Sequence, residues 1–277
     1  METFQLSYAG KQWNEDYVFV ADNFGFVLDG VTSSSKHNFS NMRSDVVWYC
    51  QTLGEYIKKH ICSKKSIFEI LKAAVKRTAE SYEKLARGKK VLDFPKSTIS
   101  LFRIVGDVVE FYTLGDSVIL IEDIFGKVFK FFDSRNGIND NIALTVMKYF
   151  STKEKKSIRQ TRLDHPEIIH WGKNLCNTRG HQYVLSKNVD DVDYGICFSI
   201  DVKLISKVIV LSDGFSQAFD LFKLETEESF VKKINKKTDA EKIYKKLRKM
   251  QQKDKDCNKF LRTKETDDSS IGFLKIN

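Results

Sequence analysis

Acidic residues stand beside apolar, strand-like segments at five places along this 277-residue chain. In chain order the places are Glu15-Asp16, Asp29-Gly30, Asp116, Asp213-Gly214 and Asp267-Asp268. A strand holds such a carboxylate rigidly while its oxygens still reach water. Carboxylates gathered at one edge of a sheet repel each other and raise each other's pKa unless a cation lies among them. Their oxygen atoms suit hard divalent ions such as Mg²⁺ or Mn²⁺, so the pattern indicates a metal site.

An Asp-Gly pair is also ordinary turn chemistry, because both residues favour tight turns. That explanation suffices for any one of the pairs. It does not explain why an acid stands at all five places, and the ordered set therefore favours a functional site.

Six short segments resemble, in their order and rough spacing, the metal-dependent protein phosphatase family, the type 2C serine/threonine phosphatases. They are Asn14-Glu15-Asp16, Leu28-Asp29-Gly30, Ser97-Thr98, Leu114-Gly115-Asp116-Ser117, Leu211-Ser212-Asp213-Gly214 and Thr266-Asp267-Asp268-Ser269-Ser270. The match extends from about Gly10 to Leu274, and the segment from Asn177 to Leu185 resembles the shorter, bacterial-type branch. Each segment is weak evidence alone, but six in order are strong evidence.

The resemblance implies a centre of two Mn²⁺ or Mg²⁺ ions, with a weaker third ion beside them. Its ligands would be Glu15 through water, Asp29 as the bridge, the carbonyl of Gly30, Asp213 and Asp267, with Asp116 for the third ion. Asp16 would orient the metal-bound water, and Lys11 would contact the substrate's phosphate. The implied reaction is hydrolysis of phosphoserine or phosphothreonine in proteins by direct attack of the metal-bridging water.

Three positions depart from the residues that the family usually has there. Lys11 stands in place of a phosphate-binding arginine, and lysine neutralises phosphate without gripping it bidentately. Val31 replaces a frequent histidine and Val118 a frequent arginine. No metal-ligand position is lost, so we expect an active phosphatase. The alternative is a weak or inactive pseudophosphatase that binds phosphoproteins or an acidic partner.

Apolar periodicity predicts the elements that must position these acids. Strands are predicted at 17–20 and 24–28, joined by a turn at Asp22-Asn23, and helices at 41–61 and 66–88. Strands at 97–105, 108–114, 117–123 and 127–132 are spaced closely enough for an antiparallel meander. A strand at 208–211, helices at 225–236 and 239–252 and a strand at 270–276 follow. Residues 133–200 show only a helix pattern near 141–150.

This order of elements predicts an α+β fold with an antiparallel core covered by helices. The family resemblance adds the layout, a four-layer sandwich of two antiparallel β-sheets packed face to face and flanked by antiparallel helix pairs. No linker or internal repeat divides the chain, so we expect one catalytic domain over residues 1–277.

The net charge of +9 is concentrated in one part of the chain. Between Leu221 and Thr266, 15 Lys and Arg stand against 8 Asp and Glu. A solvated helix face explains the lysine-rich stretch 232–249, and a docking surface for an acidic partner is the alternative. Few aromatic residues alternate with these lysines, so nucleic-acid binding is the weaker hypothesis.

Cysteine use and apolar runs predict the cellular context. The five cysteines form no CxxC pair, which argues against a disulfide framework or a thiolate zinc site. The N-terminus lacks a signal-peptide pattern, and no apolar run is long enough to span a bilayer. We therefore expect a cytoplasmic protein without membrane contact. The resemblance implies phosphoproteins made by a serine/threonine kinase as its partners, and we expect a monomer.

Overall fold

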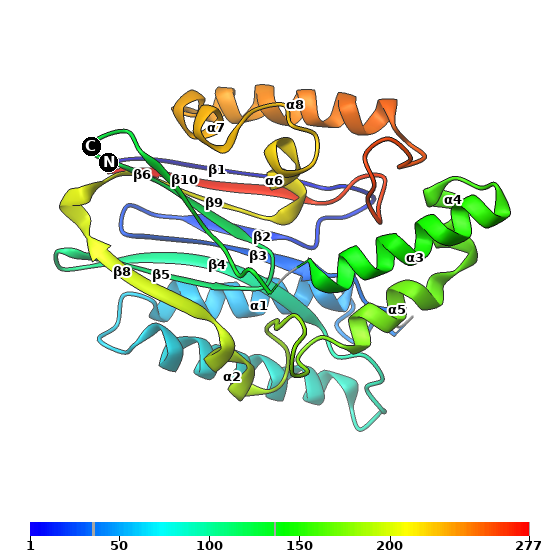
Figure 1. The fold of residues 1–277 in the computed structure, drawn as a ribbon. Helices are drawn as coiled ribbons and strands as arrows, with labels where there is room; N and C mark the ends of the chain where they lie inside the picture. Colours follow the sequence, from blue (N-terminus) through cyan, green and yellow to red (C-terminus); the bar gives the residue numbers. More distant parts are fainter. Residues whose placement is uncertain (35–36, 136, 277) are drawn as a thin grey trace.

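Two antiparallel sheets form the centre of the molecule in the computed structural model, which describes residues 1–34, 37–135 and 137–276 (Figure 1). Within those residues each sheet has five strands. The first contains, in spatial order, β1 (Glu2–Tyr8), β10 (Ser269–Lys275), β9 (Ile205–Leu211), β6 (Val118–Asp123) and β7 (Val128–Phe131). The second contains β2 (Tyr17–Val20), β3 (Phe24–Val31), β4 (Lys96–Val105), β5 (Val108–Leu114) and β8 (Ile196–Asp201).

Helices cover the outer face of each sheet (Figure 1). The second sheet carries α1 (Asp45–His60) and α2 (Ile67–Ala86), and the first carries α6 (Asp213–Asp220), α7 (Glu227–Lys233) and α8 (Lys237–Lys253). Ser44 caps α1 by accepting from the backbone N–H of Val47, and Ser66 forms a capping box with Glu69 at the start of α2.

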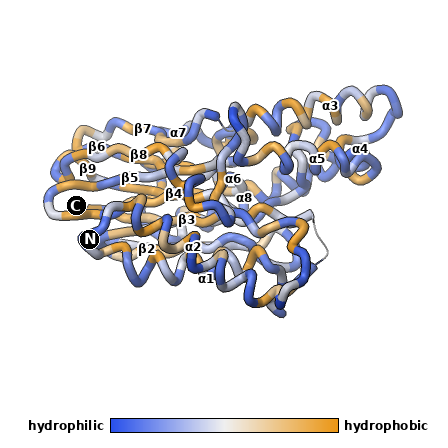
Figure 2. Tube along the Cα trace, turned by 90° about the horizontal axis from the view of Figure 1, so that it is seen from below, coloured by the Kyte–Doolittle hydropathy of each residue, from blue (hydrophilic) through white to orange (hydrophobic). Residues whose placement is uncertain are grey.

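Three buried apolar clusters lie between these four layers. One lies between α1–α2 and the second sheet, one between the two sheets, and one between the first sheet and α6–α8. Apolar residues accordingly gather along the strands in the hydropathy view (Figure 2). The predicted α+β sandwich of two face-to-face antiparallel sheets flanked by helices is therefore confirmed.

The predicted four-strand meander is wrong at one step. β5 pairs with β4 and β8, whereas β6 pairs with β7 and β9, so the chain leaves the second sheet after Leu114 and enters the first at Val118. Gly115 makes this passage with φ +94°, and a Cβ at that position would lie 2.4 Å from Thr98 Cβ. Glycine is therefore required where the chain changes sheets.

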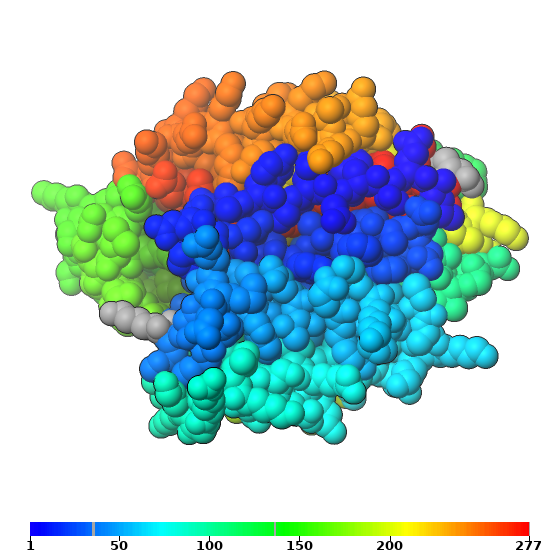
Figure 3. Space-filling model, turned by 180° about the vertical axis from the view of Figure 1, so that it is seen from behind, coloured from blue at the N-terminus to red at the C-terminus, as the bar shows by residue number. Residues whose placement is uncertain are grey.

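A helical arm, residues 138–174, projects from one end of the sandwich (Figures 1 and 3). It consists of α3 (Ile138–Glu154), α4 (Ile158–Asp164) and α5 (Pro166–Asn174), and the short 3-10 helices η1 (Val189–Tyr194) and η2 (Val202–Leu204) lie nearer the sheets. Ala143, Met147, Ile158 and Ile168 form its core with Cys257 of a neighbouring loop. Only a helix near 141–150 is expected from the sequence of this region. The rest of the arm is not predicted from the sequence, and neither are β1, β8 and α6.

No helix within the described ranges is long and apolar enough to cross a membrane.

Candidate functional site

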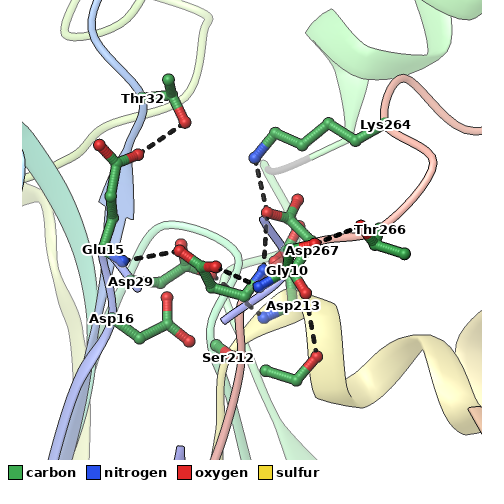
Figure 4. A network of polar contacts seen from close by, with 12 residues as sticks. Gly10, Glu15, Asp16, Asp29, Thr32, Ser212, Asp213, Lys264, Thr266 and Asp267 are labelled. Atoms are coloured by element: carbon green, nitrogen blue, oxygen red, sulfur yellow. Dashed lines mark hydrogen bonds and ion pairs between the residues drawn. The ribbon is translucent and has the colours of Figure 1, made fainter. Parts of the chain in front are cut away.

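The predicted site residues come from separate elements that end at the same side of the sandwich (Figure 4). Asp29 and Gly30 lie near the end of strand β3, and Asp116 lies in the connection from β5 to β6. Asp213 is the first residue of α6, and Asp267 precedes β10. All five line one hollow of about 140 Å³, whose other wall is the helical arm. The structure thus brings together side chains more than 200 residues apart in sequence.

Gly30 allows the end of β3 to approach the segment that carries Glu15. A Cβ at Gly30 would lie 2.6 Å from the carbonyl oxygen of Glu15 and 2.5 Å from Cγ1 of Val46. Contacts this short are not available to a side chain, so only glycine fits and its backbone faces the hollow.

Burial and mutual repulsion dominate the electrostatics of the site. Burial, reinforced by the charge of Asp268, raises the pKa of Asp16 to about 7. Burial also raises the pKa of Asp29 well above its ordinary value, with Asp16 and Asp213 adding to the effect, and does the same for Asp213 with Asp267. A cation bound among these buried carboxyls would stabilise their ionised forms.

Both carboxylate oxygens of Asp16 are fully buried and neither accepts a hydrogen bond of ordinary geometry among the described residues, although the hydroxyls of Ser270 and Ser212 lie near enough to lower its pKa. A buried, unpartnered carboxylate is costly and is retained where a further charge is expected nearby. The burial of Asp16 is thus the observation that most directly favours a cation-binding site here.

Asp140 is an acidic residue of the hollow that sequence analysis does not identify. It belongs to α3 of the arm, and burial raises its pKa. Burial and the charge of Asp140 together raise the pKa of Asp116 to about 6. The arm therefore adds a second carboxyl on the side of the hollow where a weaker third ion is implied for Asp116.

Glu15 is held to one side of this group (Figure 4). Its carboxylate accepts hydrogen bonds from Thr32 Oγ1 at 2.7 Å, Ser44 Oγ at 2.8 Å and Trp13 Nε1 at 3.3 Å. With three neutral donors, Glu15 is well placed to act through water, as the resemblance implies, and does not point at the other carboxylates.

Two side chains fix the segment that carries Asp267. Asp268 accepts from the backbone N–H groups of Gly10 at 2.6 Å and Glu15 at 2.7 Å, which ties this segment to the N-terminal ligand. Arg248 of α8 donates to the carbonyl of Asp267 at 2.7 Å. Arg248 is thus a structural anchor and does not belong to the solvated lysine face expected for residues 232–249.

The donor set fits hard divalent ions in kind, because it is made of carboxylate and carbonyl oxygens around a buried, unpartnered Asp16. As the side chains stand, no group of three or more His, Cys, Asp or Glu in residues 1–34, 37–135 and 137–276 converges on one point. Asp29 Oδ2 instead accepts from the backbone N–H of Asp213 at 3.3 Å, and Asp267 Oδ1 accepts from Lys264 at 2.7 Å. Ion binding therefore requires these two side chains to turn.

Four cationic side chains of the described residues line the two hollows at the acidic centre, and only Lys11 is expected from the sequence. Lys11 lines a second hollow of about 300 Å³ with Glu15 and Asp268, next to the first. Lys264 lines both hollows, while Arg162 of α4 and Lys173 of α5 line the first. No local motif marks the three unexpected cations, because their long side chains reach the site from segments without catalytic residues.

These cations differ in their partners. The ammonium of Lys173 donates to the carbonyl of Thr32, which ties the arm to the loop after β3, and burial lowers its pKa to about 8. Burial also lowers the pKa of Arg162 and of Lys11. For Lys264, burial acts in the same direction, but Asp267 and Asp213 outweigh it and raise the pKa.

Solved structures with the same fold are bacterial phosphatases. The Mycobacterium tuberculosis serine/threonine phosphatase PstP/Ppp superposes with a TM-score of 0.58 at 13% identity, over 99% of this chain and 98% of that chain. Serine/threonine phosphatase Stp1 from Staphylococcus aureus gives a TM-score of 0.58 at 10% identity, over 100% of this chain and 95% of that chain. The catalytic domain of PstP in complex with two manganese ions gives 0.56 at 12% identity, over 100% and 98%.

A comparison with curated proteins found no match. The sequence does match a protein family over residues 8–252, and that family is Protein phosphatase 2C. The matched residues include Glu15, Asp29, Asp116 and Asp213, and the fold, the order of the acids and the structural neighbours agree with it. The chain therefore belongs to the protein phosphatase 2C family.

Proposed function

We propose that this protein is a Mn²⁺- or Mg²⁺-dependent phosphatase that hydrolyses phosphoserine and phosphothreonine in proteins. The gathering of Asp29, Asp116, Asp213 and Asp267 around one hollow, beside the unpartnered Asp16, carries the proposal. A relative with the same fold was solved in complex with two manganese ions, which supports two ions here. When bound, such ions supply the nucleophile and neutralise charge on the phosphoryl oxygens.

The residues of this chain divide the remaining work among them. Asp29, Asp213 and Asp267, with the carbonyl of Gly30, would hold two ions, with Glu15 acting through water. Asp116, beside Asp140, would hold a weaker third ion. Asp16, buried behind this group, would orient the water. Lys11 and Arg162 would bind the phosphate from the two adjacent hollows.

The test measures turnover of p-nitrophenyl phosphate with Mn²⁺ and with EDTA, in the wild type and in Asp213→Asn. Activity should require Mn²⁺, and Asp213→Asn should lose at least about 100-fold in kcat/KM, because it removes one negative ligand from the ions. The matched control is Asp220→Asn at the other end of α6, where Asp220 pairs with Lys130 at 2.6 Å on the surface. Metal-independent turnover, or an unaffected Asp213→Asn, would contradict the proposal.

The competing function is a pseudophosphatase that binds phosphoproteins without hydrolysis. The ion pair of Lys264 with Asp267 favours it, because a proposed ligand is already neutralised by the chain itself. Calorimetry with a phosphothreonine peptide separates the two. Peptide binding with no phosphate release at millimolar Mn²⁺ would establish the pseudophosphatase, whereas we expect release.

The cellular setting is proposed on the same basis as the substrate. All five cysteines are free, which suits the reducing cytoplasm. We propose a cytoplasmic monomer that acts on the products of a serine/threonine kinase.

A further inference from the structure

We propose that Lys264 is a tethered cation of the carboxylate site: its ammonium takes the place of a divalent ion at Asp267, and an ion must displace it in order to bind there. This inference rests on the proposed metal-dependent function. It assigns to Lys264 an effect on metal affinity opposite to that of the acidic residues, because the lysine competes with the ion and the acids would bind it.

The side chain of Lys264 extends toward Asp267, one of the proposed ligands (Figure 4). Its Nζ donates to Asp267 Oδ1 at 2.7 Å, and the two side chains are only 25% and 16% exposed. Lys264 lines the same hollow as Asp213 and Asp29, and the charges of these two acids and of Asp267 together raise its pKa. An ordinary surface pair three residues apart in sequence would face solvent instead.

The backbone on both sides of Lys264 is anchored, which keeps this side chain directed at the site. Before it, Arg262 is buried and donates to Asp254 Oδ2 at 2.8 Å and to the carbonyl of Phe260 at 2.9 Å. After it, Thr266 Oγ1 donates to the carbonyl of Gly10 at 2.6 Å. The lysine is therefore held at the site by the fold and is not brought there by a freely moving loop.

Other cations near the site do not share this role. Within the part of the chain that the structure describes, neither Lys11 nor Arg162 forms an ion pair, and Lys173 is engaged with the Thr32 carbonyl. Lys264 alone among these four pairs with a proposed ligand. It lines both hollows and so stands at the boundary between the metal ligands and Lys11.

Two effects follow from a built-in cation that competes with the ion. The metal-free protein is stabilised, because one positive charge offsets part of the repulsion among buried carboxylates. The affinity for one ion is lowered, because binding must first break the Lys264–Asp267 pair. When two cations exclude each other from one site, their binding is linked by a coupling free energy. Such coupling changes the affinity for the ion about 5- to 150-fold.

The experiment compares Mn²⁺ binding by the full chain with Lys264→Gln, using calorimetry and electron paramagnetic resonance of free Mn²⁺. We expect Lys264→Gln to bind one Mn²⁺ roughly tenfold more tightly than the wild type. Its melting temperature in EDTA should fall, and the rise on adding Mn²⁺ should be larger than in the wild type. Both readouts are independent of catalysis.

The matched control is Lys11→Gln, which removes the same charge beside the same acids without breaking an ion pair. It should change Mn²⁺ affinity by less than about threefold, through long-range electrostatics alone. A Lys264→Gln variant with wild-type affinity, or with a gain no larger than that of Lys11→Gln, overturns the inference. Lys264→Arg keeps the charge and should resemble the wild type, so tighter binding by this variant also overturns it.

The outcomes separate this inference from the proposed function. If the wild type binds Mn²⁺ and Lys264→Gln binds it equally, only the inference fails. If neither binds Mn²⁺, the proposed function fails and the inference falls with it. If Lys264→Gln does not fold in EDTA, it is refolded in Mn²⁺ and its affinity is measured by competition with a chelator.

Discussion

Arg162 is the residue whose surroundings say most about the substrate. Its guanidinium comes from α4 and lines the hollow over Asp213 and Asp267, and in the described residues it makes neither a hydrogen bond nor an ion pair. An arginine that is desolvated without a partner is suited to an anionic ligand, because its planar fork binds phosphate bidentately. Lys11 cannot supply such a grip, and we predict that Arg162 supplies it in place of the arginine that the family usually has.

We predict that Arg162→Ala raises KM for p-nitrophenyl phosphate about tenfold, with a smaller change in kcat. The reason is the loss of a charge-assisted contact to the phosphate. Arg162→Lys should recover part of the loss. Arg159→Ala is the control on the same helix, since Arg159 is half exposed and pairs with Glu265 at 3.6 Å. An unchanged KM in Arg162→Ala would place phosphate binding elsewhere.

Among the individual residues of the site, the acids could be predicted from the sequence, whereas the cations other than Lys11 could not. The carboxylates lie next to strand ends, where a local pattern marks them, and the structure places Asp29, Asp116, Asp213 and Asp267 together. Arg162 and Lys264 reach the hollow through long side chains, and their positions depend on how distant segments dock. Their roles, and those of the acids, remain proposals until they are measured.

Among the elements, the helical arm is the one that forms a wall of the candidate site and still has a core of its own. It is joined to the rest of the molecule through its own small core with Cys257, through the Lys173–Thr32 contact and through Ile158, whose N–H donates to Asn258 Oδ1 at 3.0 Å. The arm forms one wall of the hollow, and we expect loosening of the arm to expose the acids.

Met147→Ala should loosen the arm without loosening the sandwich. Met147 is fully buried in the arm's core, and removing such a side chain costs about 2–5 kcal/mol locally. Hydrogen exchange should accelerate in residues 138–174 and stay unchanged in α1 and α2. The control is Leu163→Ala on the same arm, where Leu163 is 64% exposed. Uniform acceleration across the chain would mean that the arm does not unfold as a separate unit.

Elements with their own capping or periodic signal were predictable. α1 and α2 each have an apolar stripe and a serine cap, and they lie close to the predicted ranges 41–61 and 66–88. α6 was hidden because Asp213-Gly214 reads as a turn. β8 was hidden because it is an edge strand with mostly exposed residues. α4 and α5 are short and are separated by His165-Pro166, which interrupts any long period.

For the molecule as a whole, the buried acids predict how stability depends on pH. Asp16 keeps its proton in the folded protein up to about pH 7, whereas the unfolded chain releases it near its ordinary pKa of about 4. The folded state therefore binds more protons between these values, and this carboxyl lowers stability as pH rises from about 4 to 7. The effect belongs to the metal-free protein.

Asp16→Asn should therefore gain stability relative to the wild type as pH rises. Near pH 4 the two should unfold alike, and at pH 7.5 in EDTA the variant should be more stable by roughly 1–3 kcal/mol. Urea unfolding at both pH values checks this. Asp107→Asn, at an exposed turn, is the control and should show no such trend. A variant advantage that does not change with pH would show that folding leaves the pKa of Asp16 unshifted, and one that shrinks with rising pH would show that folding lowers it.

The net charge of +9 describes the outer surface and not the site. Phe230, Ile243 and Leu247 are buried against the first sheet, as the amphipathic pattern of residues 225–252 predicts. Lys242, Lys245, Lys246 and Lys249 are exposed on the other side of α8. The expectation of one domain over residues 1–277 stays a prediction.

Pairing between the first and last strands leads us to expect a particular order of events in folding. Glu2 lies opposite Lys275 and Tyr8 opposite Ser269, while Gly10 and Glu15 donate to Asp268. Contacts that close loops of about 250 residues form late, because loop-closure entropy must be overcome first. Asp267 and Lys264 directly precede this last strand. A chain whose residues up to 275 have not yet left the ribosome would therefore lack part of the proposed metal site. Manganese binding should thus report the final step of folding, which makes the ion a natural probe of newly synthesised chains.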